Sequence, residues 1–155
     1  MEESCLNNTV KVVNEILVEL FNEILTIEKA ALQSSPFSDL SITEMHVIEA
    51  IGLRSRTMTD VADQIGVTVG TLTTSINRLV NKEYVTRDRS KDDRRFVEIE
   101  LTHKGKLAHR IHQAFHDEMV GYMIEELSNE DHKVLIDSLT RLSDFFKAKY
   151  HITKK

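Results

Sequence analysis

The chain has 155 residues, of which 41% are hydrophobic and 29% are charged. This length suits one domain or two closely joined parts, and the composition is ordinary for a globular protein. The formal net charge of −5 argues at first against a nucleic-acid partner, but the charge is unevenly spread. Residues 54–95 carry nine basic and six acidic side chains, whereas residues 1–53 carry two basic and nine acidic side chains. The middle of the chain is therefore the part best suited to meet phosphates.

One proline and five glycines favour a mainly helical chain, because strands joined by tight turns use both residues freely. The single cysteine, Cys5, excludes an internal disulfide and favours the reducing cytoplasm. No basic segment precedes an apolar one at the N-terminus, and no apolar run approaches the roughly 20 residues that span a bilayer. We therefore expect a cytoplasmic protein with no membrane partner.

Two helices are predicted in the first third of the chain. Apolar residues recur at helical spacing over residues 10–32, which predicts a long amphipathic helix that ends near Pro36. A second helix is expected to begin at Ser41, because Glu44 three residues later completes a capping-box pattern. This second helix is expected to close at Gly52.

The next two predicted helices are short and close together. Residues 57–59 lead into the first, which runs through Val61, Ala62 and Ile65 and stops at Gly66. The second runs from near residue 69 to about residue 83, with Thr68 as its N-cap. Two short helices joined by a tight turn that contains glycine are typical of the helix-turn-helix motif. Purely structural helical hairpins use the same turn, so this motif alone leaves the function open.

A predicted β-hairpin follows directly. Residues 84–90 and 95–101 alternate in hydrophobicity, and residues 91–94 between them have the composition of a turn. Its tip is rich in arginine and lysine. A helix-turn-helix motif followed by a basic hairpin is the winged-helix arrangement.

Two further helices complete the chain. Thr102 is expected to cap a helix that runs to about Leu127, and Ser128 is expected to open the last helix. The first helix and these last two have more apolar surface than the small middle domain can cover, which favours burial against a second copy of the chain. We therefore predict a mainly α fold. Residues 41–102 are predicted to form a winged helix-turn-helix DNA-binding domain with a small β-hairpin wing. Residues 1–40 and 103–155 are predicted to form a helical dimerisation region.

The exposed face of the helix over residues 69–83 is the candidate reading surface. On a helical wheel its apolar residues gather on one side, and small hydroxyl residues, an amide and an arginine gather on the other. Such side chains suit entry into the major groove, where arginine pairs with guanine and asparagine with adenine. The wing would add contacts to phosphates and to the minor groove. The predicted DNA-binding residues are Thr68, Gly70, Thr71, Thr74, Asn77, Arg78, Arg89, Lys91, Arg94 and Arg95.

Three segments together resemble the MarR family, namely residues 66–79, 87–95 and 101–105. The third segment is Leu-Thr-His-Lys-Gly and the second ends in Asp-Arg-Arg. The resemblance implies a homodimer of winged helices on double-stranded DNA with a pseudo-palindromic operator. It also implies an effector pocket between the dimerisation helices and the reading head.

Residues 41–46, 67–75 and 109–116 further resemble the members of this family that repress fatty-acid biosynthesis genes. That resemblance implies long-chain acyl-acyl carrier protein as corepressor, with no resident cofactor. An acyl chain would require an apolar, tail-shaped tunnel. The predicted pocket residues are Phe21, Ile24, Ile27, Met45, His46, Ile51, His112, Phe115, His116 and Met119.

Other effectors stay open. His109, His112 and His116 recur at helical spacing, and with His46 they have the chemistry of a zinc site. An oxidant acting on Cys5 and a small lipophilic molecule are further alternatives. No nucleophile elbow, phosphate-binding glycine loop or His-Glu-x-x-His pattern occurs, so we do not expect an enzyme.

Overall fold

The computed structural model describes residues 2–90 and 95–150, which hold six helices and one three-stranded antiparallel sheet. In chain order the elements are α1 (Glu2–Gln33), α2 (Ile42–Ile51), β1 (Arg56–Thr57), α3 (Met58–Ile65), α4 (Val69–Asn81), β2 (Val85–Arg89), β3 (Val97–Leu101), α5 (His103–Ile124) and α6 (Asn129–Tyr150). The predicted fold class is confirmed. Within the described ranges, no helix combines the length and apolar character that crossing a membrane requires.

The chain divides into two compact units, Met1–Glu44 and Met45–Lys155. The first unit is dominated by α1, which begins several residues before the predicted start at Val10. The reason is that Leu6 extends the apolar stripe of α1 by a further turn toward the N-terminus. Much of this stripe, including Leu6, Ile16 and Phe21, is exposed in a single chain.

Side-chain caps mark the helix starts in the second unit and at its border, at Ser41 and Thr68 as predicted and also at Thr57. At α2, Ser41 N donates to Glu44 Oε2 at 2.8 Å and Glu44 N donates to Ser41 Oγ at 3.2 Å, which confirms the capping box. Thr57 and Thr68 accept hydrogen bonds from the first turns of α3 and α4. Gly66 ends α3 with φ 71°, a left-handed conformation that glycine adopts without a Cβ clash.

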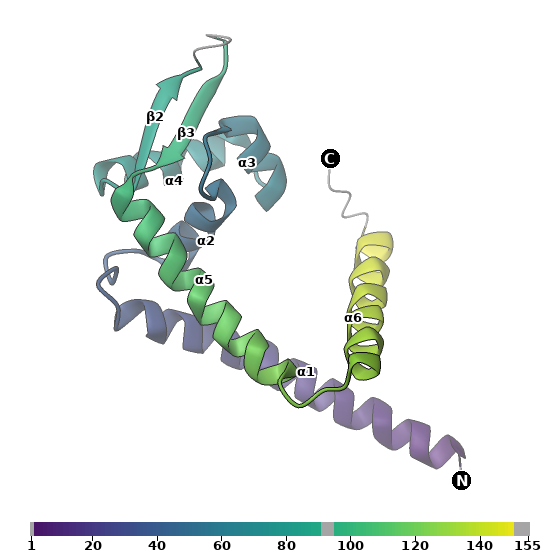
Figure 1. The fold of residues 1–155 in the computed structure, drawn as a ribbon. Helices are drawn as coiled ribbons and strands as arrows, with labels where there is room; N and C mark the ends of the chain where they lie inside the picture. The colour runs from purple at the N-terminus through teal and green to yellow at the C-terminus, as the bar shows by residue number, and fades with distance from the viewer. Residues whose placement is uncertain (1, 91–94, 151–155) are drawn as a thin grey trace. The chain divides into compact units, whose positions relative to one another are not determined.

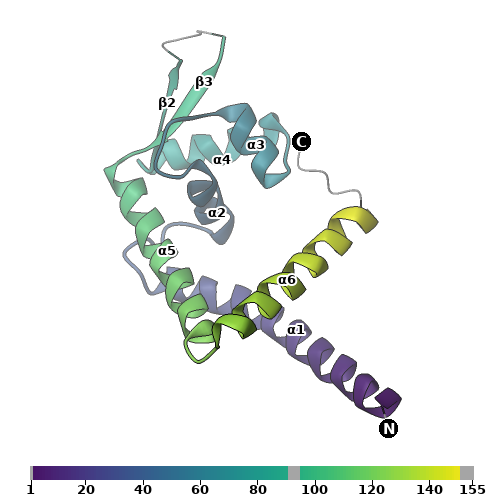
Figure 2. The same cartoon turned by 45° about the vertical axis from the view of Figure 1, so that its right-hand side comes forward.

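The sheet has the order β1-β3-β2. Strands β2 and β3 form the predicted hairpin, with Val85 opposite Leu101 and Arg89 opposite Val97. Figures 1 and 2 show this hairpin extending beyond α3 and α4. Strand β1 was not predicted from the sequence, because its two residues are too few to show an alternating pattern.

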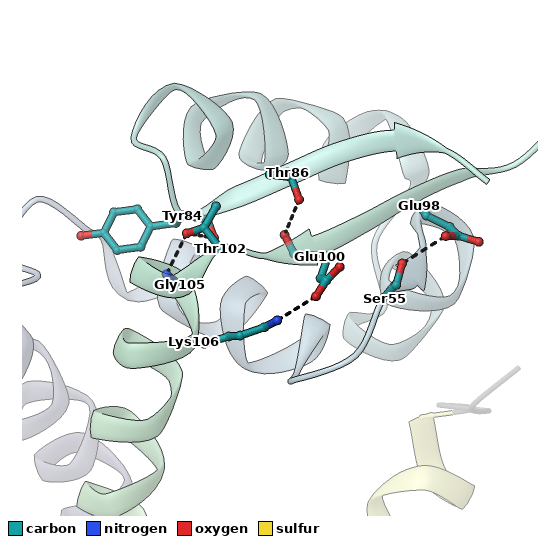
Figure 3. Close-up of polar contacts among 8 residues, drawn as sticks. All are labelled: Ser55, Tyr84, Thr86, Glu98, Glu100, Thr102, Gly105 and Lys106. Carbon is teal, nitrogen blue, oxygen red and sulfur yellow. Dashed lines mark hydrogen bonds and ion pairs between the residues drawn. The ribbon is translucent and has the colours of Figure 1, made fainter. Parts of the chain in front are cut away.

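The junction between the hairpin and α5 is tightly packed (Figure 3). Thr102 caps α5 by accepting from Gly105 N at 3.1 Å, and its hydroxyl donates to Glu83 O at 2.7 Å. A Cβ on Gly105 would lie 2.1 Å from Tyr84 O, so only glycine allows α5 to approach the backbone this closely. Lys106 Nζ, one turn into α5, pairs with Glu100 Oε1 of β3 at 2.7 Å.

Two predicted helix ends differ from the structure by a few residues, while the predicted start of α6 at Ser128 agrees with it. Helix α4 stops at Asn81 rather than residue 83, because Glu83 adopts φ 65° and turns the chain into β2. Helix α5 ends at Ile124 rather than near Leu127. The Ser128 hydroxyl donates to Asp131 Oδ2 at 2.7 Å, and with the Ser128 backbone N–H it holds the pKa of Asp131 below its usual value.

Candidate nucleic-acid interface

Helix α4 has one buried face and one exposed face. Leu72, Ile76 and Leu79 are completely buried and form part of the core of the second unit. The residues of the predicted reading face are all exposed or half-buried, namely Gly70, Thr71, Thr74, Asn77 and Arg78. The division of the helix into these two faces is therefore as the wheel predicted, and the DNA contacts themselves stay a prediction.

The first turn of α4 is capped by Thr68 and was predicted to lie near a phosphate. Thr68 Oγ1 accepts from Thr71 N at 3.1 Å, and the hydroxyls of Thr68 and Thr71 lie 3.0 Å apart. A Cβ on Gly70 would meet only Thr68 Oγ1, at an ordinary contact distance of 3.8 Å. The fold of the single chain thus does not demand glycine at position 70. A phosphate that approached the helix N-terminus closely would require glycine there, because backbone N–H groups at that end favour negative charge and a side chain would block the approach.

Arg87 was not among the predicted residues, and it links the hairpin to α4. Arg87 Nη1 donates to Asn77 Oδ1 at 3.1 Å. Arg87 stands opposite Ile99 in the hairpin, and residues directly opposite each other project from the same face of a sheet. Because Ile99 is fully buried toward the helices, Arg87 projects toward α4. A sequence signal for this contact was present in the alternation of β2. Arg87 follows buried Val85 by two residues, so both side chains lie on the same face of the strand.

The contact with Arg87 orients the amide of Asn77. One lone pair of its oxygen accepts from the guanidinium, so the amide nitrogen and its two donors lie on the other side. This hydrogen bond favours one orientation of the Asn77 carboxamide. If Asn77 contacts a base edge as predicted, an orienting bond would favour discrimination between base edges.

The wing supplies part of the predicted positive surface. Arg89 at the end of β2 and Arg95 before β3 are both exposed. Lys91 and Arg94, which were predicted to form the tip, lie outside the described residues. Between the hairpin and the start of α4 lies a cleft of about 340 Å³, lined by Met58, Val69, Thr73, Arg87 and Phe96 among others.

Comparison with known proteins decides the family. Residues 38–95 match the model of the MarR family. The structure of FabT from Streptococcus pneumoniae in complex with DNA is 43% identical, covers 90% of this chain and 98% of that chain, and superposes with a TM-score of 0.82. The chain belongs to the MarR family. It is therefore a DNA-binding transcription regulator and not an enzyme.

Two less similar structures share the fold. The S. aureus MepR–DNA complex is 20% identical, covers 86% of this chain and 97% of that chain, and has a TM-score of 0.66. A mutant of MarR from E. coli is 18% identical, covers 83% of this chain and 94% of that chain, and has a TM-score of 0.59. No curated protein sequence gives a significant match.

The predicted effector-pocket residues of this MarR-family chain fall in both units. In the first unit, Phe21 and Ile27 are exposed on α1 and Ile24 is half-buried. In the second unit, Met45 and Ile51 are completely buried. Met45 and Ile51 are buried as core side chains are, and their contact with a ligand stays a prediction.

The remaining pocket residues gather around α5. The rings of His112 and His116 meet edge to face with centroids 4.5 Å apart, and Phe115 lies against His116 at 5.4 Å. His46 of α2 lies 6.1 Å from His112 between ring centroids. Met119, one turn beyond Phe115, is exposed. The structure thus brings His46, His112 and His116 together as one group of imidazoles.

Substitution of Arg87 by alanine is expected to relax base discrimination by the MarR-family reading head. Loss of the bond to Asn77 frees its amide, so the ratio of operator binding to random-sequence binding should fall several-fold, consistent with about 1 kcal/mol. The matched control is Arg89→Ala, which should weaken both DNAs about equally because phosphate contacts carry no sequence information. Fluorescence anisotropy with both duplexes measures the ratio. Equal losses in the two variants would mean that Arg87 acts only through its charge.

Proposed function

We propose that this regulator represses fatty-acid biosynthesis genes and takes long-chain acyl-acyl carrier protein as its corepressor. The observation that carries the proposal is the 43% identity with FabT over nearly the full length of both chains. Residues 41–46, 67–75 and 109–116 carry the more specific resemblance to repressors of fatty-acid genes. The protein would act in the cytoplasm, where its DNA lies.

The proposed working form is a homodimer on a pseudo-palindromic operator. Both units leave apolar side chains exposed in a single chain, among them Leu6 and Phe21 on α1 and Val134 and Phe145 on α6. Isolated soluble chains rarely expose so much apolar helix surface, so a second copy is its natural cover. Residues 1–40 and 103–155 would form this interface, and residues 41–102 would read the DNA.

The dimer defines the geometry of the operator. Two recognition helices related by a two-fold axis enter successive major grooves about one helical turn apart. Thr71, Thr74, Asn77 and Arg78 would contact base edges, while Thr68, Gly70 and Arg89 would contact phosphates. Lys91, Arg94 and Arg95 would carry the wing toward the minor groove.

The proposed corepressor requires an apolar lining with a few polar groups. Phe21, Ile24, Ile27, Met45, Ile51, Phe115 and Met119 would meet the acyl chain. His46, His112 and His116 would lie near the polar atoms of the thioester or pantetheine. Because their rings already form one group, they offer several hydrogen-bonding nitrogens at one place.

The corepressor proposal predicts that acylation of the carrier protein controls affinity for DNA. Acyl carrier protein with a long acyl chain should tighten operator binding at least about tenfold, the scale of a coupling free energy of about 1.4 kcal/mol. The unacylated carrier and a short-chain form are the controls and should have little effect. Gel-shift titration of purified protein measures all three. Equal affinity with the three carriers would remove the fatty-acid proposal and leave the family assignment unchanged.

A further inference from the structure

The residues that follow α4 are held by the first residues of α5. Lys104 Nζ donates to Lys82 O at 3.0 Å, and the Thr102 hydroxyl donates to Glu83 O at 2.7 Å. The Thr102 backbone N–H donates to Tyr84 O at 3.0 Å, and Figure 3 shows these two residues meeting. Three successive carbonyl oxygens after α4 therefore each accept a hydrogen bond from the start of α5.

The side chain of Lys104 is well suited to hold the end of a helix. Its ammonium group lies at the C-terminal end of α4, where carbonyl groups carry a partial negative charge. The same ammonium lies 4.0 Å from the centroid of the Tyr84 ring, which is a cation–π distance. Tyr84 itself is completely buried. Lys104 therefore holds both the end of α4 and the start of the hairpin from one position on α5.

The backbone conformation of Glu83 depends on this support. Glu83 has φ 65°, and among the residues that the structure describes it is the only one other than glycine with a positive φ. A left-handed backbone raises the free energy of an ordinary residue, so it persists where surrounding contacts fix it. The hydrogen bond from Thr102 fixes the carbonyl group of this residue. The turn that leads out of α4 is thus held by contacts with α5.

Close packing leaves α5 little freedom to change its angle at the same place. A Cβ on Gly105 would lie 2.1 Å from Tyr84 O, and Ala108 is completely buried. Packed side chains and backbones move between discrete arrangements and do not deform continuously. The end of α4 and the first turns of α5 therefore move as one rigid body.

In the proposed homodimer this rigid connection determines where the two reading heads lie. Residues 103–155 of each chain belong to the proposed dimerisation region, so the position of each α4 depends on its junction with α5. One base pair changes the distance between two half-sites by about 3.4 Å and their relative rotation by about 35°. A fixed junction therefore selects one half-site spacing, whereas a loosened junction would also accept neighbouring spacings.

We propose that Lys104 is a positioning residue that sets the half-site spacing accepted by the dimer. It lies at the C-terminal end of α4, outside the proposed DNA-contacting residues, and acts by holding α4 against α5. The inference rests on the proposed homodimer and is independent of the corepressor and of the genes controlled.

Selection of bound duplexes from a random pool, carried out with the parent protein and with Lys104→Met, tests the proposal. Methionine keeps a long unbranched side chain and removes the ammonium group. The parent should enrich pseudo-palindromes of a single half-site spacing, and Lys104→Met should enrich neighbouring spacings as well. Insertion of one base pair at the centre of the parent's selected duplex should weaken the parent at least about tenfold. It should weaken Lys104→Met about threefold or less.

Two further variants serve as controls, and circular dichroism checks the fold of each. Lys106→Met removes the same charge two residues later, from a half-buried ion pair with the Glu100 side chain instead of from the end of α4. It should keep the parent's spacing and the parent's loss on insertion. Lys104→Arg keeps a charged donor at the junction and should keep most of the parent's discrimination.

The outcomes separate the proposal from the proposed homodimer. A folded Lys104→Met variant that enriches only the parent's spacing, or that is weakened equally on both duplexes, would overturn the proposal and leave the homodimer intact. The same spread of spacings with Lys106→Met would also overturn it, because charge alone would then be responsible. A parent that enriches single half-sites, with one chain bound per duplex, would contradict both.

Discussion

Replacing Arg78 with alanine is expected to weaken binding to the operator by about 1–3 kcal/mol per half-site, which is at least about tenfold overall. Arg78 is exposed on α4, four residues after Thr74 and beside Asn77, and it is the only arginine on this helix. A guanidinium at this place can donate two parallel hydrogen bonds to guanine, which no other side chain on the helix can replace.

Arg110→Ala removes the same charge from an exposed position on α5, outside the proposed reading surface, and is the matched control. Anisotropy titrations with operator and random duplexes should show a large, operator-selective loss for Arg78→Ala and a small, unselective one for Arg110→Ala. If both variants lost the same affinity, Arg78 would contribute only general charge. The assignment of α4 as the base-reading element would then be wrong.

Gly105→Ala, at the junction between the hairpin and α5, is expected to destabilise the protein by about 3 kcal/mol. The added methyl would stand 2.1 Å from Tyr84 O and 3.2 Å from Leu101 Cβ, and the first of these is a backbone atom that cannot rotate away (Figure 3). The start of α5 must then move off the hairpin, which disturbs the Thr102 cap and its hydrogen bond to Glu83.

Gly121→Ala provides a control in the same helix, since no atom lies within 4 Å of the added Cβ. Alanine favours helix over glycine by about 1 kcal/mol, so this variant should be equal to or more stable than the parent. For a chain of this size, thermal unfolding should show a midpoint about 6–12 °C lower for Gly105→Ala. Equal midpoints for the two variants would contradict the close packing described at this junction.

Local chemical signals made most of the fold predictable. Threonines before α4 and α5 marked their starts, because a side-chain oxygen there satisfies an unpaired backbone N–H. The wheel of α4 separated core from exposed residues correctly, since a helix repeats every 3.6 residues whatever its surroundings. Strand β1 could not be predicted in this way. It exists only because Arg56 and Thr57 pair with β3, more than forty residues later.

The site was less predictable, because its contacts join distant segments. The bond from Arg87 to Asn77 depends on how the hairpin folds back over α4, which no local pattern records. The histidines show the same limit. The sequence grouped His109 with His112 and His116, and the structure brings the last two together through their Nε2 atoms at 3.1 Å. Glu49 was not predicted to join them, because it comes from another helix.

Selection of bound duplexes from a random pool, followed by titration of the selected duplex at several salt concentrations, tests DNA reading most directly. We expect an enriched pseudo-palindrome whose half-sites lie about 10 base pairs apart, and an affinity that falls steeply as salt rises. The binding stoichiometry should be two chains, and so two reading heads, per duplex. A pool with no enriched sequence, or binding that does not change with salt, would contradict the assignment of α4 and the wing as a sequence-specific reading head.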